Sequence, residues 1–423
     1  MKFSKHTILE GLRVVTVPMK DNPTVTVLVM VEAGSKYETK EISGLSHFLE
    51  HMCFKGTVRR PRVSDISREL DSLGSQYNAF TSQEYTGYYA KADYKHTDKI
   101  LDIVSDLYLN PTFPEKEIEK EKGVIIEEIN MYQDLPQRHV QDLFMKLLYG
   151  DQPAGWNIAG SRQSVSAMNR ENFLSYRDKH YVQSATVVIV AGRMNEAEMV
   201  AQIRQRFAEA RAGRKGGKLS VREEQSGPVM LIEKRKTDQT HLAIGVRTFG
   251  VGSPFEPVLA VLNVILGGGM SSRLFLKLRD EMGVGYYVRS FHDPYTDHGY
   301  LQAAAGVDKK RLAEVIGAIT GEFRRFKDEV VLPEELKKGK DYFMGNLYLS
   351  LESSDALAEY YGFQEILKGR GETPDEVGKK IAAVTAEDVK RAAGQIFGDD
   401  RLNLAVVGDV GAEAELRAAL TLG

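Results

Sequence analysis

The stretch from His47 to His51 holds residue types whose spacing suits metal binding. In an α-helix, at about 100° per residue, Glu50 lies roughly 60° to one side of His47 and His51 roughly 40° to the other, so one ion can face all three. Neutral imidazoles are good zinc ligands, and a catalytic zinc typically has three protein ligands and one open position. The stretch therefore indicates a zinc site in which Glu50 serves as base. The alternative is two surface histidines on an amphipathic helix.

The elements that must position these residues can be read from the same region. A single helix is expected here, with Ser43 as its N-cap and Gly56 as its C-terminal stop. Cys53, two residues beyond His51, points away from the pair of histidines, so we expect a small thiol in the core and not a ligand.

A third ligand has to come from another part of the chain. The charged run at 115–128 predicts a helix, most of whose charged side chains are solvated. Glu121 and Glu128 are a heptad apart, about 20° out of register, so both can face inward. We expect Glu128 to be the third ligand and Glu121 to orient a histidine from behind.

Composition bounds the function classes. The chain has 423 residues, 42% hydrophobic and 27% charged, and a net charge of −3. With both signs interspersed, the charge favours neither nucleic acid nor a membrane as partner. Cys53 is the one cysteine, which excludes an intrachain disulfide and suits a reducing compartment. Because no apolar run reaches about 18 residues, a cytoplasmic location is expected.

The chain repeats one layout twice. Landmarks recur at an offset of about 216 residues: strand pairs beginning near Val14 and Val229, helices led by Pro114 and Pro333, and strand ends at Gly192 and Gly408. Residues 213–228, rich in glycine and charge, are typical of a linker. We therefore expect an N-terminal domain at 1–212 with the zinc site and a homologous C-terminal domain at 229–423. The counterpart of His47, near 263–267, offers no histidine or glutamate, so the second domain is expected to lack metal ligands.

The mixture of alternating strands and long amphipathic helices predicts the fold class. We expect an α+β protein in which each domain packs helices on a mostly antiparallel sheet.

These motifs together resemble a known family. The H-x-x-E-H pattern, the segment 78–82 and Glu128 are similar to those of the inverzincin peptidases, which include pitrilysin, insulysin and the mitochondrial processing peptidase. The likeness covers nearly the whole chain, including the glycine-rich segment 267–275. The length resembles the short two-domain bacterial and mitochondrial branch.

The resemblance implies roles for particular residues. By position, His47, His51 and Glu128 would bind one Zn²⁺ per subunit, and Glu50 would be the general base. It also implies a second group of residues around a bound peptide. An Arg and Tyr pair, matched here by Arg279 and Tyr286, would stabilise the oxyanion, and an edge strand containing Asn78, Ala79 and Phe80 would hold the peptide by backbone pairing.

The implied function is a zinc endopeptidase acting on peptides or unfolded segments inside a chamber formed by two subunits, as a homodimer or with a homologous partner. Two alternatives stay open: a non-catalytic assembly or peptide-binding subunit, and an active subunit that requires an inactive homologue.

Overall fold

The computed structural model describes residues 2–423, and the chain divides into two compact units, each built around one β-sheet. The first unit comprises the chain up to Ile129 together with Trp156–Leu219 and Tyr348–Thr373. The second comprises Asn130–Gly155, Ser220–Leu347 and Pro374–Gly423. Within residues 2–423, each helix is too short or too polar to cross a lipid bilayer.

The sheet of the first unit has six strands in the order β1-β2-β6-β3-β5-β4. β2 and β6 run parallel, and the other neighbouring strands run antiparallel. The strands are β1 (Ser4–Ile8), β2 (Leu12–Pro18), β3 (Thr24–Val31), β4 (Gln76–Thr81), β5 (Thr86–Asp93) and β6 (Thr186–Gly192). The helices are α1 (Leu45–Cys53), α2 (Val63–Ser72), α3 (Thr97–Leu109), most of α4 (Glu115–Asp134), α6 (Arg162–Ala167), α7 (Arg170–His180), α8 (Glu196–Arg206) and α13 (Ser354–Lys368).

Helices cover both faces of this sheet, and β3 shows why. Its sequence is a nearly continuous apolar run, typical of a strand buried on both sides. Val27 and Val29 belong to the core that also includes residues of α1 and α3. On the opposite face, Leu28 and Met30 lie against Gly362 of α13, where a Cβ would come within 2.8 Å of the Met30 sulfur.

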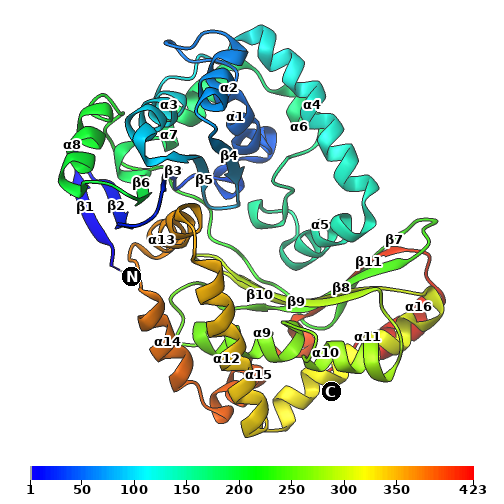
Figure 1. The fold of residues 1–423 in the computed structure, drawn as a ribbon. Helices are drawn as coiled ribbons and strands as arrows, with labels where there is room; N and C mark the ends of the chain where they lie inside the picture. Colours follow the sequence, from blue (N-terminus) through cyan, green and yellow to red (C-terminus); the bar gives the residue numbers. More distant parts are fainter. Residues whose placement is uncertain (1) are drawn as a thin grey trace. The chain divides into compact units, whose positions relative to one another are not determined.

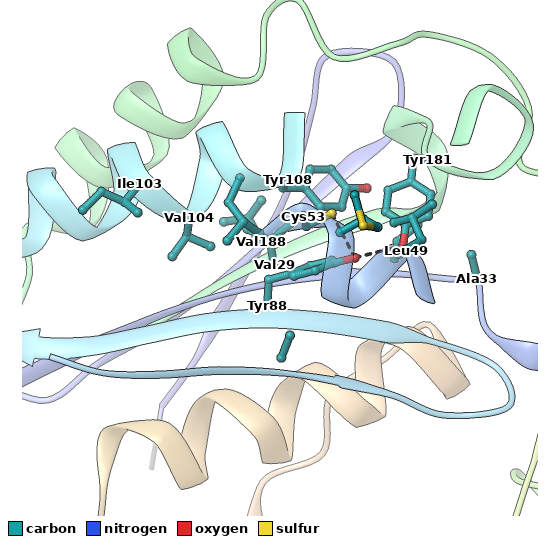
Figure 2. Close-up of a cluster of buried hydrophobic side chains, with 14 of the residues drawn as sticks. Val29, Ala33, Leu49, Cys53, Tyr88, Ile103, Val104, Tyr108, Tyr181 and Val188 are labelled. Carbon is teal, nitrogen blue, oxygen red and sulfur yellow. Dashed lines mark hydrogen bonds between the residues drawn. The ribbon is translucent and has the colours of Figure 1, made fainter. Parts of the chain in front are cut away.

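The core behind α1 is closed by aromatic side chains (Figure 2). The Cys53 thiol donates to the Tyr88 hydroxyl at 3.5 Å, and the Tyr88 and Tyr181 hydroxyls lie 3.2 Å apart. Burial raises the pKa of the Cys53 thiol to about 11, so it stays protonated. Cys53 is thus a core thiol, as its position on the helix predicted.

The sheet of the second unit has five strands in the order β7-β11-β8-β10-β9, of which β7 and β11 run parallel. The strands are β7 (Val229–Lys234), β8 (Thr240–Thr248), β9 (Tyr287–Pro294), β10 (Gly299–Val307) and β11 (Leu402–Gly408). The helices are α5 (Pro136–Tyr149), α9 (Glu256–Gly267), α10 (Arg273–Phe275), α11 (Leu312–Asp328), most of α12 (Pro333–Ser350), α14 (Pro374–Ala383), α15 (Ala386–Ile396) and α16 (Glu413–Ala419).

The two halves of the chain exchange one helix each. α13, from the second half, packs on β3 and β6 of the first unit, while α5, from the first half, packs on β11 and β8 of the second (Figure 1). The compact units therefore differ from the contiguous domains predicted at 1–212 and 229–423. The cause is that α4 and α12 each begin in one unit and end in the other. The helix that follows each of them therefore packs on the sheet of the other unit. The division near residue 219 falls inside the predicted linker at 213–228.

The predicted α+β class, with sheets that are mostly antiparallel and covered by helices, is confirmed. The repeated landmarks also coincide with real elements: β6 ends at Gly192 and β11 ends at Gly408.

Candidate metal centre and active site

The helix α1 presents one apolar and one polar side. Leu45, Phe48, Leu49 and Met52, spaced at three and four residues, are fully buried. The opposite side of the helix carries His47, Glu50 and His51. Packing of the apolar side therefore fixes which way the three polar residues point.

The start of α1 differs from the prediction. The N-cap is Gly44 and not Ser43, so the cap residue has no side chain that could bond to the helix. Gly44 has a φ of 96°, and Glu38 accepts hydrogen bonds from the first turn instead. At the other end α1 stops at Cys53, and Gly56, with a φ of 126°, follows in the next turn.

Three candidate ligands from two helices converge. Oε2 of Glu128, on α4, lies 3.6 Å from Nε2 of His47 and 3.6 Å from Nε2 of His51. One ligand atom from each residue lies within 4.8 Å of the others. These separations are longer than those of ordinary hydrogen bonds, and they leave room for an ion between the three ligand atoms.

The geometry fits a zinc ion. Zinc bonds to nitrogen and oxygen of about 2.0–2.1 Å in a tetrahedron place neighbouring ligand atoms roughly 3.4 Å apart. The observed separations of 3.6 Å are close to this edge length. Burial, aided by the nearby His51, lowers the pKa of His47 to about 3, so that its imidazole is neutral and can donate a lone pair.

A carboxylate holds the His51 ring, and an amine in turn holds that carboxylate. Nδ1 of His51 lies 2.9 Å from Oε1 of Glu121, and Nζ of Lys55 lies 2.7 Å from Oε2 of the same carboxylate. Although burial favours the protonated acid, the hydrogen bonds from His51 and Lys55 lower the pKa of Glu121 overall. When Nδ1 is the donor in this hydrogen bond and the ring is neutral, the lone pair of His51 is on Nε2, the atom that faces Glu128. The structure thus places Glu121 beside a histidine, and its role in orienting a metal ligand stays a prediction.

Glu50 has a fixed partner as well. The Thr81 hydroxyl, at the end of β4, donates to Oε2 of Glu50 at 2.5 Å. Burial raises the pKa of Glu50, and this effect outweighs the hydrogen bond from Thr81 and the charge of His51. The carboxyl is thereby brought closer to the neutral range.

The predicted substrate strand is an edge of its sheet. β4 is the last strand in the order and contacts α1. Asn78 is exposed, and its Oδ1 accepts a hydrogen bond from the N–H of Ala79 at 2.9 Å. The Phe80 ring packs 5.7 Å from the ring of Phe363 on α13. The side chain of Phe80 therefore packs against α13, and the role of the strand backbone in holding a peptide stays a prediction.

Arg279 and Tyr286 lie in the second unit, so their predicted role stays a prediction. Arg279 sits in a π-helical turn, Leu276–Glu281, a distortion often found at functional sites. Nη1 of Arg279 donates to the carbonyls of Gly285 at 2.6 Å and Tyr286 at 3.2 Å. The Tyr286 side chain is 70% exposed, and both residues line a pocket of about 540 Å³.

Sequence reasoning missed Lys55, Thr81 and Glu38. Lys55 lies four residues after His51, the spacing that brings side chains together on a helix, so this signal was available. The contacts of Thr81 and Glu38 depend on how strands and loops fold back on α1, which spacing alone does not reveal.

Comparisons with known proteins agree with this geometry. A family profile described as "Insulinase (Peptidase family M16)" matches residues 13–162, and one described as "Peptidase M16 inactive domain" matches residues 167–343.

Curated relatives align along nearly the full chain. An uncharacterized zinc protease of Bacillus subtilis, YmxG, is 36% identical over 401 residues, covering 94% of this chain and 96% of the relative. An uncharacterized zinc protease of Mycobacterium leprae is 34% identical over 421 residues, covering 99% and 94%.

Two solved structures share the fold. A protease from Helicobacter pylori superimposes with a TM-score of 0.88 at 20% identity, covering 96% of this chain and 99% of that one. A peptidase M16 inactive domain from Pseudomonas fluorescens gives a TM-score of 0.89 at 18% identity, covering 97% and 99%. The resemblance read from the motifs is thereby confirmed: this chain belongs to peptidase family M16, whose zinc protease relatives share its two-domain fold.

Proposed function

We propose that this chain is a zinc-dependent endopeptidase that hydrolyses peptides or unfolded polypeptide segments. The observation that carries the proposal is the convergence of His47, His51 and Glu128, with Glu50 on the same arc of α1. A zinc ion held by these three residues would lower the pKa of a bound water to about 7 and polarise the scissile carbonyl.

Glu50 is the proposed general base and acid. It takes a proton from the attacking water and delivers it to the departing amine. Because Thr81 donates to Oε2, Oε1 is the oxygen proposed to move the proton. Burial raises the pKa of Glu50, which makes this carboxylate a stronger base than an exposed glutamate.

The substrate backbone is proposed to pair with the edge of β4. The N–H of Ala79 is bonded to the side chain of Asn78, so an incoming strand that pairs at Ala79 has to displace Asn78 Oδ1. A backbone-paired peptide must be extended, which favours short peptides and unfolded segments over folded proteins.

Arg279 and Tyr286 are proposed to stabilise the oxyanion. Both hydrogen bonds of Arg279 to its own loop start at Nη1. A guanidinium has five N–H donors, so Nη2 and Nε are able to donate to a substrate oxygen. We also propose that two subunits, identical or homologous, enclose the chamber, and that the protein acts in the cytoplasm.

The direct test is cleavage of an internally quenched peptide by the purified chain. We expect cleavage that a chelator abolishes and Zn²⁺ restores. Glu50→Gln should bind zinc as tightly as the wild type, yet lose activity by a factor of at least about 10². A fully active Glu50→Gln variant would contradict the mechanism, and a wild type that binds zinc without cleaving any peptide would favour a non-catalytic subunit or one that needs a partner.

A further inference from the structure

The first turn of α1 cannot be capped by its own N-cap residue. A Cβ at Gly44 would lie 2.5 Å from the carbonyl oxygen of Ala159, and the φ of 96° disfavours every residue with a side chain. Serine, threonine, aspartate and asparagine, which normally cap helices, are therefore excluded at this position. The free N–H groups of the first turn need an acceptor from elsewhere.

Glu38 supplies that acceptor from outside the helix. Its Oε2 accepts from the Gly44 N–H at 2.7 Å, and its Oε1 accepts from the Ser46 N–H at 2.6 Å. The side chain is buried, so these bonds do not compete with bulk water. One carboxyl group thus fixes both the N-cap and the second residue of α1.

A second buried contact, made by α7, holds the same turn of α1. The Ser46 hydroxyl lies 2.8 Å from the hydroxyl of Tyr176 on α7, and Tyr176 donates to the Gly34 carbonyl at 3.1 Å. Ser46 and Tyr176 are both buried. Glu38, Ser46 and Tyr176 form a polar bracket at the start of α1, and none of its hydrogen bonds includes His47, His51 or Glu128.

The two candidate histidine ligands differ in how their rings are held. Glu121 holds the His51 ring at Nδ1. Among residues 2–423, by contrast, nothing bonds to the buried Nδ1 of His47. The direction of the His47 ring therefore depends on its packing and on the backbone of the first turn, of which it is the third residue.

From these observations we propose that Glu38 is a positioning residue: through the bracket it fixes the first turn of α1 and so aims the imidazole of His47 at the metal centre. The inference rests on the proposed function, because it assumes that His47 is a metal ligand. It predicts that damage to Glu38 weakens metal binding and catalysis although Glu38 touches neither metal nor substrate.

The test is Glu38→Gln, with Glu41→Gln as the matched control. Glutamine keeps the shape of Glu38 but has one acceptor oxygen and one amide nitrogen, so one of the two backbone N–H groups loses its bond whatever the charge of Glu38. Glu41 lies three residues away, is exposed, and undergoes the same chemical substitution without any hydrogen bond to the first turn of α1 within residues 2–423. Tyr176→Phe removes the other arm of the bracket and gives a second reading if Glu38→Gln does not fold.

The readout is Co²⁺ binding by the metal-free protein, followed through the visible absorption of the ion. We expect Glu38→Gln to raise the Kd for Co²⁺ by about tenfold and to alter the absorption band, as loss of groups that orient metal ligands does. Tyr176→Phe should do the same to a smaller extent, and Glu41→Gln should match the wild type. In the peptide assay, kcat should fall while KM stays within about twofold.

Several outcomes would overturn the inference. If Glu38→Gln and Tyr176→Phe fold and give the wild-type Co²⁺ spectrum and Kd, the bracket only stabilises the fold. A control variant that behaves like Glu38→Gln would show that the effect does not come from the hydrogen bonds of Glu38 to the first turn. If the wild type cleaves no peptide while these Co²⁺ results hold, only the proposed function is wrong. If the wild type binds no Co²⁺, the proposed function and the inference about Glu38 are both wrong.

Discussion

At the scale of single residues, spacing predicted much of the candidate site. The 100° rotation per residue placed His47, Glu50 and His51 on one arc, and the heptad from Glu121 to Glu128 placed both carboxylates on one side of α4. The structure brings these side chains together. Periodicity succeeds here because each pair lies on a single helix, where the geometry is set by the backbone alone.

Other features at this scale were beyond the sequence. Ser43 was predicted as the N-cap from residue type, but the close approach of Ala159 requires glycine at 44 and moves the capping role to Glu38. The hydroxyl partner of Glu50 is Thr81, which lies 31 residues later at the end of β4. Such contacts depend on tertiary packing, which no local pattern encodes.

A buried histidine outside the site predicts how stability depends on pH. His180 is 1% exposed, and burial, followed by the charge of Lys179, lowers its pKa to about 4. Between pH 6.5 and 4 the unfolded chain binds a proton at His180 that the folded chain does not, so stability falls as the pH falls. We expect roughly 2 kcal/mol of this loss at pH 5 relative to pH 8.

Urea unfolding of the wild type and of His180→Gln at both pH values isolates this effect. As the pH falls from 8 to 5, the free energy of unfolding should decrease less for His180→Gln than for the wild type. An unchanged difference would mean that His180 titrates equally in the folded and unfolded chains.

At the scale of elements, the sequence predicted several strands and helices but not which sheet each helix covers. The strand ends at Gly192 and Gly408 and the helices led by Pro114 and Pro333 were expected, and all four are present. The sequence of an amphipathic helix shows that one of its faces is apolar, but it does not show which surface this face packs against. The exchange of α5 and α13 between the two sheets was missed for this reason.

The docking of α13 gives a prediction about packing. Gly362 lets α13 approach the sheet closely, because a Cβ there would already lie 2.8 Å from the Met30 sulfur and 3.3 Å from Cδ1 of Ile189. Gly362→Leu should therefore destabilise the protein by about 1–3 kcal/mol through overpacking. Gly123→Leu on α4 is the matched control, since a Cβ at Gly123 meets nothing within 4 Å and leucine is a better helix former.

Chemical denaturation of both variants provides the measurement. We expect a lower denaturation midpoint for Gly362→Leu and an equal or higher midpoint for Gly123→Leu. Equal midpoints for the two variants would show that α13 does not pack as closely as described.

At the scale of the whole molecule, the chain has two sheets, each with its own helices and each completed by a helix from the other half. The repeated landmarks at an offset of about 216 residues predict a duplication of one fold, and this stays a prediction. They could not predict the exchange, because α5 and α13 occupy comparable places in the two repeats whether or not they cross over. The candidate zinc ligands all come from the first unit, while the segment 263–267 in the second has none.

This exchange predicts that the N-terminal half cannot stand alone. A fragment of residues 1–219 lacks α13, so Leu28, Met30 and Ile189 would be exposed to water. We expect this fragment to aggregate or to show no cooperative thermal unfolding. Adding a peptide of residues 348–373 should restore cooperative unfolding, whereas the same peptide with Gly362→Leu should restore less.

The outcome is read by circular dichroism during heating. A fragment of residues 1–219 that unfolds cooperatively and stays monomeric without the peptide would show that the contiguous domain at 1–212 is an independent unit after all.

The most direct test of the account is crystallographic: anomalous diffraction from zinc-loaded crystals, recorded on both sides of the zinc absorption edge. We predict one strong peak per chain, with Nε2 of His47, Nε2 of His51 and a carboxylate oxygen of Glu128 each about 2.0–2.2 Å from it. A peak ligated by other residues, or no peak near α1 with Glu128 turned away from both imidazoles, would contradict it.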